Sequence, residues 1–198
     1  MAAMRLALFL LAVLAAASAA AAFDLAPREQ AALDQGRPFV DVRPAADGDS
    51  GLIQAAIDIE ASPEVVFSVI ADCDLAPRMV MSLKSCRITE RDPAGRWDVR
   101  EQVSKMTFLP SVRNVFRSDY EPPRAIRFHR VSGDLKVYEG EWRIEPRGAG
   151  ARVTYEAQVG TPFRVPRPLA RMGLRMEVPR ALLALRREAL ARARAYGR

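Results

Sequence analysis

Hydrophobic and polar residues alternate along much of the chain, beginning with residues 52–61. Ile53, Ile57 and Ile59 fall on one face of this segment, whereas Asp58 and Glu60 fall on the other. A period of two predicts a β-strand with one buried side. The same alternation, bounded by turn signals, predicts six more strands joined as antiparallel hairpins, over residues 84–91, 97–105, 112–120, 125–131, 135–145 and 151–159.

Two segments have the spacing of amphipathic helices. The sequence Ser62-Pro63-Glu64 predicts a helix start, because serine caps a helix and proline fits its first turn; this helix should end near Asp72. A long helix is predicted over residues 167–196, kinked by Pro179. Its apolar residues lie three, four or seven apart, which predicts one stripe made of Leu169, Met172, Met176, Leu183 and Leu190.

The first 22 residues differ from the rest, since Arg5 and Ser18 are their only non-apolar positions. A basic start, a short apolar run and a small-residue end are typical of a secretory signal peptide. We therefore expect residues 1–22 to be removed on export and the protein to be periplasmic, with an uncleaved membrane anchor as the alternative. The polar residues 23–50 form an N-terminal extension, for which the pattern predicts a short helix over 27–34 and a strand over 38–43.

Composition excludes several classes of site. One histidine and two cysteines exclude a zinc finger, an iron–sulfur cluster and most histidine-rich metal sites, so no metal and no cofactor is expected. The formal net charge is +6, but 27 of the 30 basic residues are arginines. We interpret this bias as a property of a GC-rich coding sequence and expect no nucleic-acid partner.

Cys73 and Cys86 are the two cysteines of the chain. Export would place them in an oxidising compartment, where a disulfide between them is one interpretation. Two buried free thiols are the other. The sequence leaves both open.

A family resemblance appears in the middle and second half of the chain. Residues 71–88 and 133–166 resemble START-like (SRPBCC) proteins of the polyketide cyclase/dehydrase and coenzyme-Q-binding type. The residues that carry the resemblance are Ala71-Asp72, Pro77, Lys84-Ser85-Cys86-Arg87-Ile88, Gly133, Lys136, Gly140, Trp142-Arg143-Ile144, Pro146, Ala151-Arg152-Val153-Thr154-Tyr155-Glu156 and Val165-Pro166. The resemblance covers roughly residues 50–195, and it includes no catalytic signature.

The resemblance implies an α+β helix-grip fold, in which a curved seven-stranded antiparallel sheet surrounds a long C-terminal helix. It assigns residues 51–198 to a START-like ligand-binding domain. Members of the family mostly bind lipids or other hydrophobic small molecules between sheet and helix, and a minority are cyclases or dehydratases. An apolar cavity is therefore expected, without an identified ligand.

Candidate site residues follow from this fold and the alternation pattern. The expected cavity lining comprises Val103, Phe116, Phe128, Tyr138, Trp142, Tyr155, Met172 and Met176. The expected cavity mouth comprises Met79, Val80 and Met81 in one loop, with Phe108 and Leu109 at a hairpin tip. Glu101 is expected to point inward beside Val103, either as an acid–base group or paired with an arginine, whereas His129 should point outward.

Three functions remain open. The leading hypothesis is an exported, non-enzymatic binder or carrier of a lipid or isoprenoid, and a cyclase or dehydratase using a polar pocket residue is the second. A closed-core interaction domain is the third. The long helix and its lead-in also carry nine arginines against Glu177 and Glu188. This pattern indicates either a solvated face or transient contact with anionic lipid headgroups.

Overall fold

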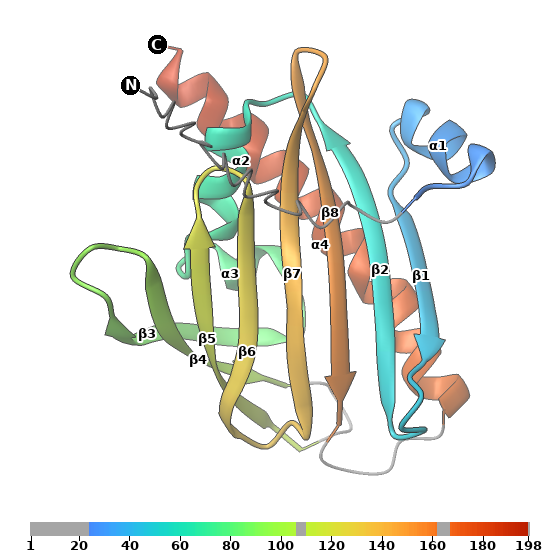
Figure 1. Cartoon of the computed structure of the whole chain (residues 1–198), viewed down its shortest axis with the longest axis vertical. Coiled ribbons are helices and arrows are strands. Elements are labelled where there is room, and N and C mark those ends of the chain that lie inside the picture. Colours follow the sequence, from blue (N-terminus) through green and yellow to red (C-terminus); the bar gives the residue numbers. More distant parts are fainter. Residues whose placement is uncertain (1–23, 106–109, 162–166, 198) are drawn as a thin grey trace, which may run out of the picture.

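The computed structural model describes residues 24–105, 110–161 and 167–197, with residues 167–171 described by their backbone only (Figure 1). The elements follow the predicted order. They are α1 (Pro27–Asp34), β1 (Phe39–Pro44), β2 (Ser50–Ile59), α2 (Pro63–Ile70), α3 (Ala76–Met79), β3 (Leu83–Arg91), β4 (Trp97–Ser104), β5 (Val112–Glu121), β6 (Ala125–Gly133), β7 (Val137–Arg147), β8 (Gly150–Gly160) and α4 (Arg167–Tyr196).

The strands form one antiparallel sheet in the order β1-β2-β8-β7-β6-β5-β4-β3. Figure 1 shows this sheet curving, with α4 crossing one side of it. We call that side the inner face. The predicted helix-grip fold is confirmed, but the sheet has eight strands and not seven. The additional strand is β1, predicted within the N-terminal extension, which pairs with β2 in the register Val42↔Ile53.

Local signals explain the helix boundaries. The Ser62 hydroxyl accepts a hydrogen bond from the Val65 N–H at 3.4 Å, and Pro63 occupies the first turn of α2. Gly36 follows α1 with a φ of +72°, a conformation that glycine adopts without strain. The short helix α3 was not predicted, because four residues are too few to show a helical period.

The main core lies where α2 and α4 pack on β2, β7 and β8. Ile57, Ile144 and Val153 are fully buried on the sheet, and Val66 and Val69 of α2 lie against them. Helix α4 contributes a stripe of residues at helical spacing, namely Val178, Leu182, Leu185 and Ala189. This core resembles the interior of an ordinary two-layer domain.

The predicted apolar stripe of α4 is not the one that packs against the sheet. Met172 and Met176 are 54% and 51% exposed, and Leu183 is 37% exposed, so these side chains are open to solvent and not part of the core. Leu169 lies outside the described side chains. Helix α4 carries two apolar stripes on opposite sides, and the smaller aliphatic residues of the second stripe pack closely against α2 and the sheet. A single period cannot tell which of two stripes is buried.

Helix α1 and β1 join the N-terminal extension to the rest of the fold. Leu33 of α1 is 2% exposed, and Arg152 of β8 reaches Gln30 of α1 and Asp58 of β2, each at 2.7 Å. Arg186 of α4 donates to the carbonyl oxygen of Gly36 at 2.9 Å.

Among the helices that the structure describes, none combines the length and the hydrophobicity needed to span a membrane.

Candidate functional site

Five aromatic side chains gather on the inner face of β5 to β8. We call Phe116, Phe128, Tyr138, Trp142 and Tyr155 the aromatic floor. Phe116 and Phe128 are buried, whereas Tyr138, Trp142 and Tyr155 are partly exposed. Ring centroids lie 4.9 Å apart for Phe128 and Tyr138 and 4.2 Å apart for Trp142 and Tyr155. These five predicted residues thus form one continuous apolar surface.

The strand register brings these rings together. Trp142 lies opposite Tyr155, and Phe128 lies opposite Gly140. A Cβ atom at Gly140 would lie 2.8 Å from the Phe128 ring and 2.1 Å from the Glu156 carbonyl oxygen. The Phe128 ring can therefore lie across β7 only because residue 140 has no side chain.

The floor also carries two phenol groups. Burial raises the pKa of Tyr138 to about 12, although Arg100 opposes the increase, and burial likewise raises the pKa of Tyr155. Neither hydroxyl hydrogen-bonds to another described residue. Both phenols therefore stay protonated at neutral pH and present hydrogen-bond donors within an apolar surface.

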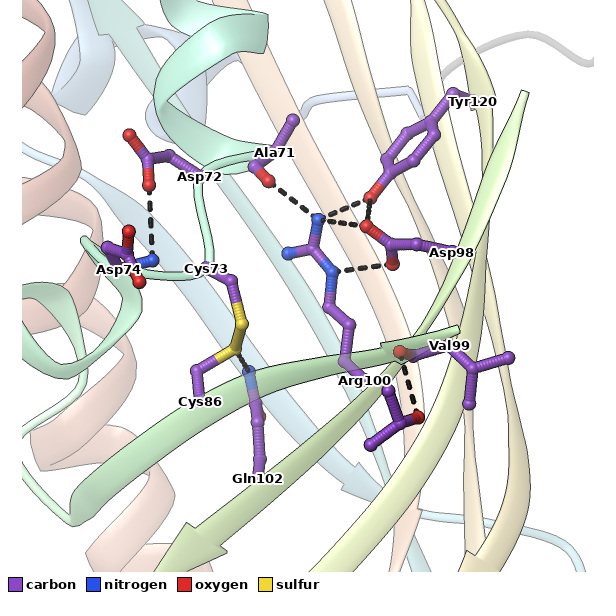
Figure 2. The surroundings of a disulfide bond; sticks show 11 residues. Ala71, Asp72, Cys73, Asp74, Cys86, Asp98, Val99, Arg100, Gln102 and Tyr120 are labelled. Atoms are coloured by element: carbon purple, nitrogen blue, oxygen red, sulfur yellow. Dashed lines mark hydrogen bonds and ion pairs between the residues drawn. A yellow bond between two sulfur atoms is a disulfide. The ribbon is translucent and has the colours of Figure 1, made fainter. Parts of the chain in front are cut away.

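A buried polar network lies on β4 and β5 (Figure 2). It is next to the floor, because Arg100 lies opposite Phe116 in the strand register. Arg100 and Asp98 are 5% and 3% exposed. The Arg100 Nε donates to Asp98 Oδ1 at 2.8 Å, and its Nη2 donates to Asp98 Oδ2 at 3.0 Å and to the Tyr120 hydroxyl. The Tyr120 hydroxyl donates in turn to Asp98 Oδ2 at 2.6 Å. The two buried charges thus form an ion pair joined by two hydrogen bonds.

This network holds the end of α2 against the sheet. The Arg100 Nη2 donates to the Ala71 carbonyl oxygen at 2.6 Å, just past the last turn of α2. A disulfide bond joins Cys73 to Cys86 of β3, with the two Cα atoms 5.5 Å apart, close to the same point (Figure 2). Burial raises the pKa of Tyr120, and the charge of Arg100 only partly offsets this increase.

Residues on β4 occupy the opposite face from the one predicted. Because Arg100 and Asp98 are internal, the alternation of the strand places Val103 and Glu101 on the outer face. Glu101 accepts from Arg87 at 3.0 Å and from Arg113 at 2.6 Å, and these bonds hold the pKa of its carboxyl below the ordinary value. Val103 is thus no part of the floor, and Glu101 is not an inward acid. A buried Asp–Arg pair is more polar than valine, so the hydrophobic pattern predicted the wrong face.

The remaining predicted residues are dispersed. Met79 packs against the main core, Val80 is partly exposed, and Met81 is 64% exposed. Phe108 and Leu109 lie outside the described residues. Met172 and Met176 are more than half exposed and are not among the residues packed against the floor. The expected mouth therefore does not come together as one cluster of described side chains.

A separate groove of about 480 Å³ opens between the end of α2 and β3, next to the disulfide. Its lining is mixed in charge and comprises Ser68, Ala71, Asp72, Cys73, Asp74, Cys86, Arg87, Ile88 and Arg91. Burial raises the pKa of the Asp72 carboxyl, but the bond from Arg192 at 2.5 Å, the charge of Arg192 and the backbone N–H groups of Asp74 and Leu75 together outweigh this, so the net shift is downward. This groove has neither an apolar lining nor the aromatic floor.

We also searched the described residues for an acid–base histidine and for a metal site. His129 is exposed on the outer face, with its Nδ1 3.8 Å from Asp119 Oδ2, as its position in β6 predicted. Among the residues that the structure describes, no group of three or more His, Cys, Asp or Glu side chains is placed to hold a metal ion. The sequence pattern did not single out Asp98, Arg100 or Tyr120 as site residues. The signal for the first two was a pair of charged residues at alternate positions of β4.

Comparison with known proteins identifies a family and several solved structures that are similar to this chain. The family described as polyketide cyclase / dehydrase and lipid transport matches residues 59–186. A STAR-related lipid transfer protein from Xanthomonas axonopodis is 17% identical with a TM-score of 0.64, and the match covers 77% of this chain and 93% of that one. The Zhui aromatase/cyclase from a Streptomyces species is 17% identical with a TM-score of 0.58, covering 75% and 96%.

A START superfamily protein from Mycobacterium smegmatis is 20% identical with a TM-score of 0.59, covering 71% of this chain and 97% of that one. At these identities the likeness shows the fold. No curated protein matches the chain at a significant level. The family and these neighbours fit a binder of hydrophobic ligands or a cyclase. Since the matched residues span most of the chain, it belongs to the polyketide cyclase / dehydrase and lipid transport family.

Proposed function

We propose that the protein binds a hydrophobic small molecule, a lipid or an isoprenoid, against the aromatic floor and carries it without chemical change. The observation that carries this proposal is the partial exposure of Tyr138, Trp142 and Tyr155 on the inner face of the sheet. Large apolar rings left partly open to solvent at a concave surface are typical of ligand sites. The family membership supports the same class of ligand.

The energetics favour an apolar ligand. Covering apolar surface contributes roughly 25 cal/mol per Å², so an extended hydrocarbon gains affinity without any reactive group. The hydroxyls of Tyr138 and Tyr155 supply donors for one carbonyl or hydroxyl oxygen of the ligand. The expected ligand is thus mostly apolar, with one polar acceptor group.

The same contacts argue against a cyclase or dehydratase. Such an enzyme needs an acid or base whose pKa lies near the working pH. Tyr138, with its pKa raised to about 12, is a weak acid, and the carboxyl of Glu101 lies on the outer face. Asp98 is engaged by Arg100 and Tyr120. Tyr138 and Asp98 lie on the inner face, and neither group is suited to proton transfer at neutral pH.

We also propose that the carrier works in the periplasm. The apolar residues 1–22 have the layout of a signal peptide. The disulfide between Cys73 and Cys86 suits an oxidising compartment.

The first test is to identify the ligand directly. The protein purified from its native host without detergent should release one stoichiometric lipid or isoprenoid on organic extraction, detected by mass spectrometry. An empty extract from well-folded protein, combined with turnover of a polyketide-like substrate, would overturn the carrier proposal.

A second test places the ligand. The chain has two tryptophans, of which Trp142 lies in the floor and Trp97 lies on the outer face under Arg117, 4.3 Å from its ring centroid. In a Trp97→Phe variant, added ligand should change the fluorescence of Trp142. Val159→Trp, which crowds the floor beside Tyr138, should abolish loading.

The matched control is Val103→Trp, at a partly exposed valine on the outer face. It should load normally. Equal loading of both tryptophan variants would contradict the proposed position of the ligand.

A further inference from the structure

The outer side of α4 presents a second amphipathic stripe. Its members recur three, four or seven residues apart, so they share one face of the helix. All of them are exposed: Met172, Met176, Arg180, Leu183, Arg187 and Arg194. We call this set the outer stripe. Three of its side chains are apolar although nothing described covers them, and the other three are cationic.

The outer stripe contains no acidic residue. The two acidic residues of α4 lie on other sides of the helix. Glu177 accepts from the Ser82 N–H at 3.0 Å, and Glu188 lies 3.7 Å from Arg78. The outer stripe is therefore purely cationic and apolar.

Two other arginines of the helix behave differently. Arg186 donates to the backbone oxygen of Asp58 at 2.7 Å, and Arg192 pairs with Asp72 at 2.5 Å. These two residues hold the helix on the body of the protein. By contrast, Arg180, Arg187 and Arg194 have no acidic partner among the residues that the structure describes. Arg194 donates only to the Leu190 carbonyl oxygen of its own helix, at 3.2 Å, so none of the three charges is neutralised by a described carboxylate.

We propose that the outer stripe docks the protein on an anionic lipid bilayer. Guanidinium groups bind lipid phosphates, and methionine and leucine enter the headgroup boundary beside them, as in other interfacial helices. The three arginines span about 21 Å along the helix axis, so they can engage one flat surface together. A protein partner with an acidic surface would use the charges but would not require the exposed methionines. The inference does not depend on the ligand site, because the outer stripe shares no residue with the aromatic floor and lies opposite the core-packing stripe of α4.

The test is co-sedimentation with vesicles. The mature protein should bind vesicles of phosphatidylglycerol mixed with phosphatidylcholine and should not bind phosphatidylcholine alone. Salt at ~1 M, which shortens the screening length to about 3 Å, should release it. Replacing the three arginines of the outer stripe by glutamate should weaken binding at least about 100-fold, because each arginine near such a surface contributes about fivefold.

A matched variant separates the stripe from net charge. Arg28→Glu, Lys84→Glu and Arg91→Glu change three exposed cations on α1 and β3 by the same total charge. This control should retain most of the binding that the stripe variant loses. Equal loss in both triple variants, or equal binding to both kinds of vesicle, would overturn the proposal.

A tryptophan introduced into the outer stripe tests membrane contact without any change of charge. Leu183→Trp replaces an exposed residue, so its fold should be retained. Its fluorescence should shift to the blue on addition of anionic vesicles and be quenched by brominated acyl chains. An unchanged spectrum on vesicles that bind the protein would show that another surface makes the contact.

Discussion

The buried pair of Arg100 and Asp98 makes the sharpest prediction about stability. Replacing Arg100 by methionine keeps most of the apolar stem but removes the guanidinium. Asp98, only 3% exposed, then keeps the Tyr120 hydroxyl as its hydrogen-bond donor and loses both bonds from Arg100. The Ala71 carbonyl oxygen loses its donor as well.

The structure sets the size of the effect. Removing one member of a buried ion pair costs about 3–5 kcal/mol, because the other charge stays buried without its partner. For a domain of this size, the melting temperature should fall by about 10 °C. Arg124→Met removes an exposed pair with Glu121, in which the arginine side chain is 73% exposed, and should cost less than about 1 kcal/mol.

Urea unfolding at neutral pH, followed by circular dichroism, measures both variants and a double variant. Adding Asp98→Asn to Arg100→Met removes the orphaned charge and keeps an acceptor for Tyr120. The double variant should therefore recover at least about 2 kcal/mol of the loss. Two results would contradict this reasoning: a loss of less than about 1 kcal/mol in the free energy of unfolding for Arg100→Met, or strictly additive losses for the two substitutions. Either result would mean that Arg100 does not stabilise the buried charge of Asp98.

Three further substitutions test separate features. Replacing Cys73 and Cys86 by alanine should cost about 3 kcal/mol in urea unfolding, since the bridge joins residues 13 apart; a variant as stable as the wild type would mean that the loop is ordered without the bridge. Gly140→Ala should cost about 1–3 kcal/mol in the same assay, because its Cβ would lie 2.1 Å from the Glu156 carbonyl oxygen, and no loss would mean that β7 and β8 can separate freely. Burial raises the pKa of Tyr138 to about 12, whereas an unfolded chain loses this proton near ~10, so its contribution is complete below about pH 10 and is lost as pH rises to about 12. Tyr138→Phe should reduce that alkaline loss, and a parallel profile for both proteins would contradict the assignment.

Local patterns along the chain were enough for most of the fold. The alternation in residues 52–61 and 151–159 predicted β2 and β8, which pair with each other in the sheet, and Ser62-Pro63 predicted the start of α2. The bounds of α1 and α4 agree with those predicted, because proline near one end and a change of period near the other are signals within a few residues. Five of the predicted site residues form the aromatic floor for the same reason, since alternate positions of a strand share a face.

What the sequence by itself determined, then, is the order and type of the elements and the family to which they belong. Only the tertiary structure decided which face of β4 and which stripe of α4 turn inward. Asp98 and Arg100 are buried because each pairs with the other and Arg100 also binds the end of α2, a contact between segments 29 residues apart. Met172 and Met176 are exposed because Leu182, Leu185 and Ala189 pack more closely against α2 and the sheet. Both outcomes depend on which partner is available in space, and a hydrophobic period along one chain segment contains no information about that partner.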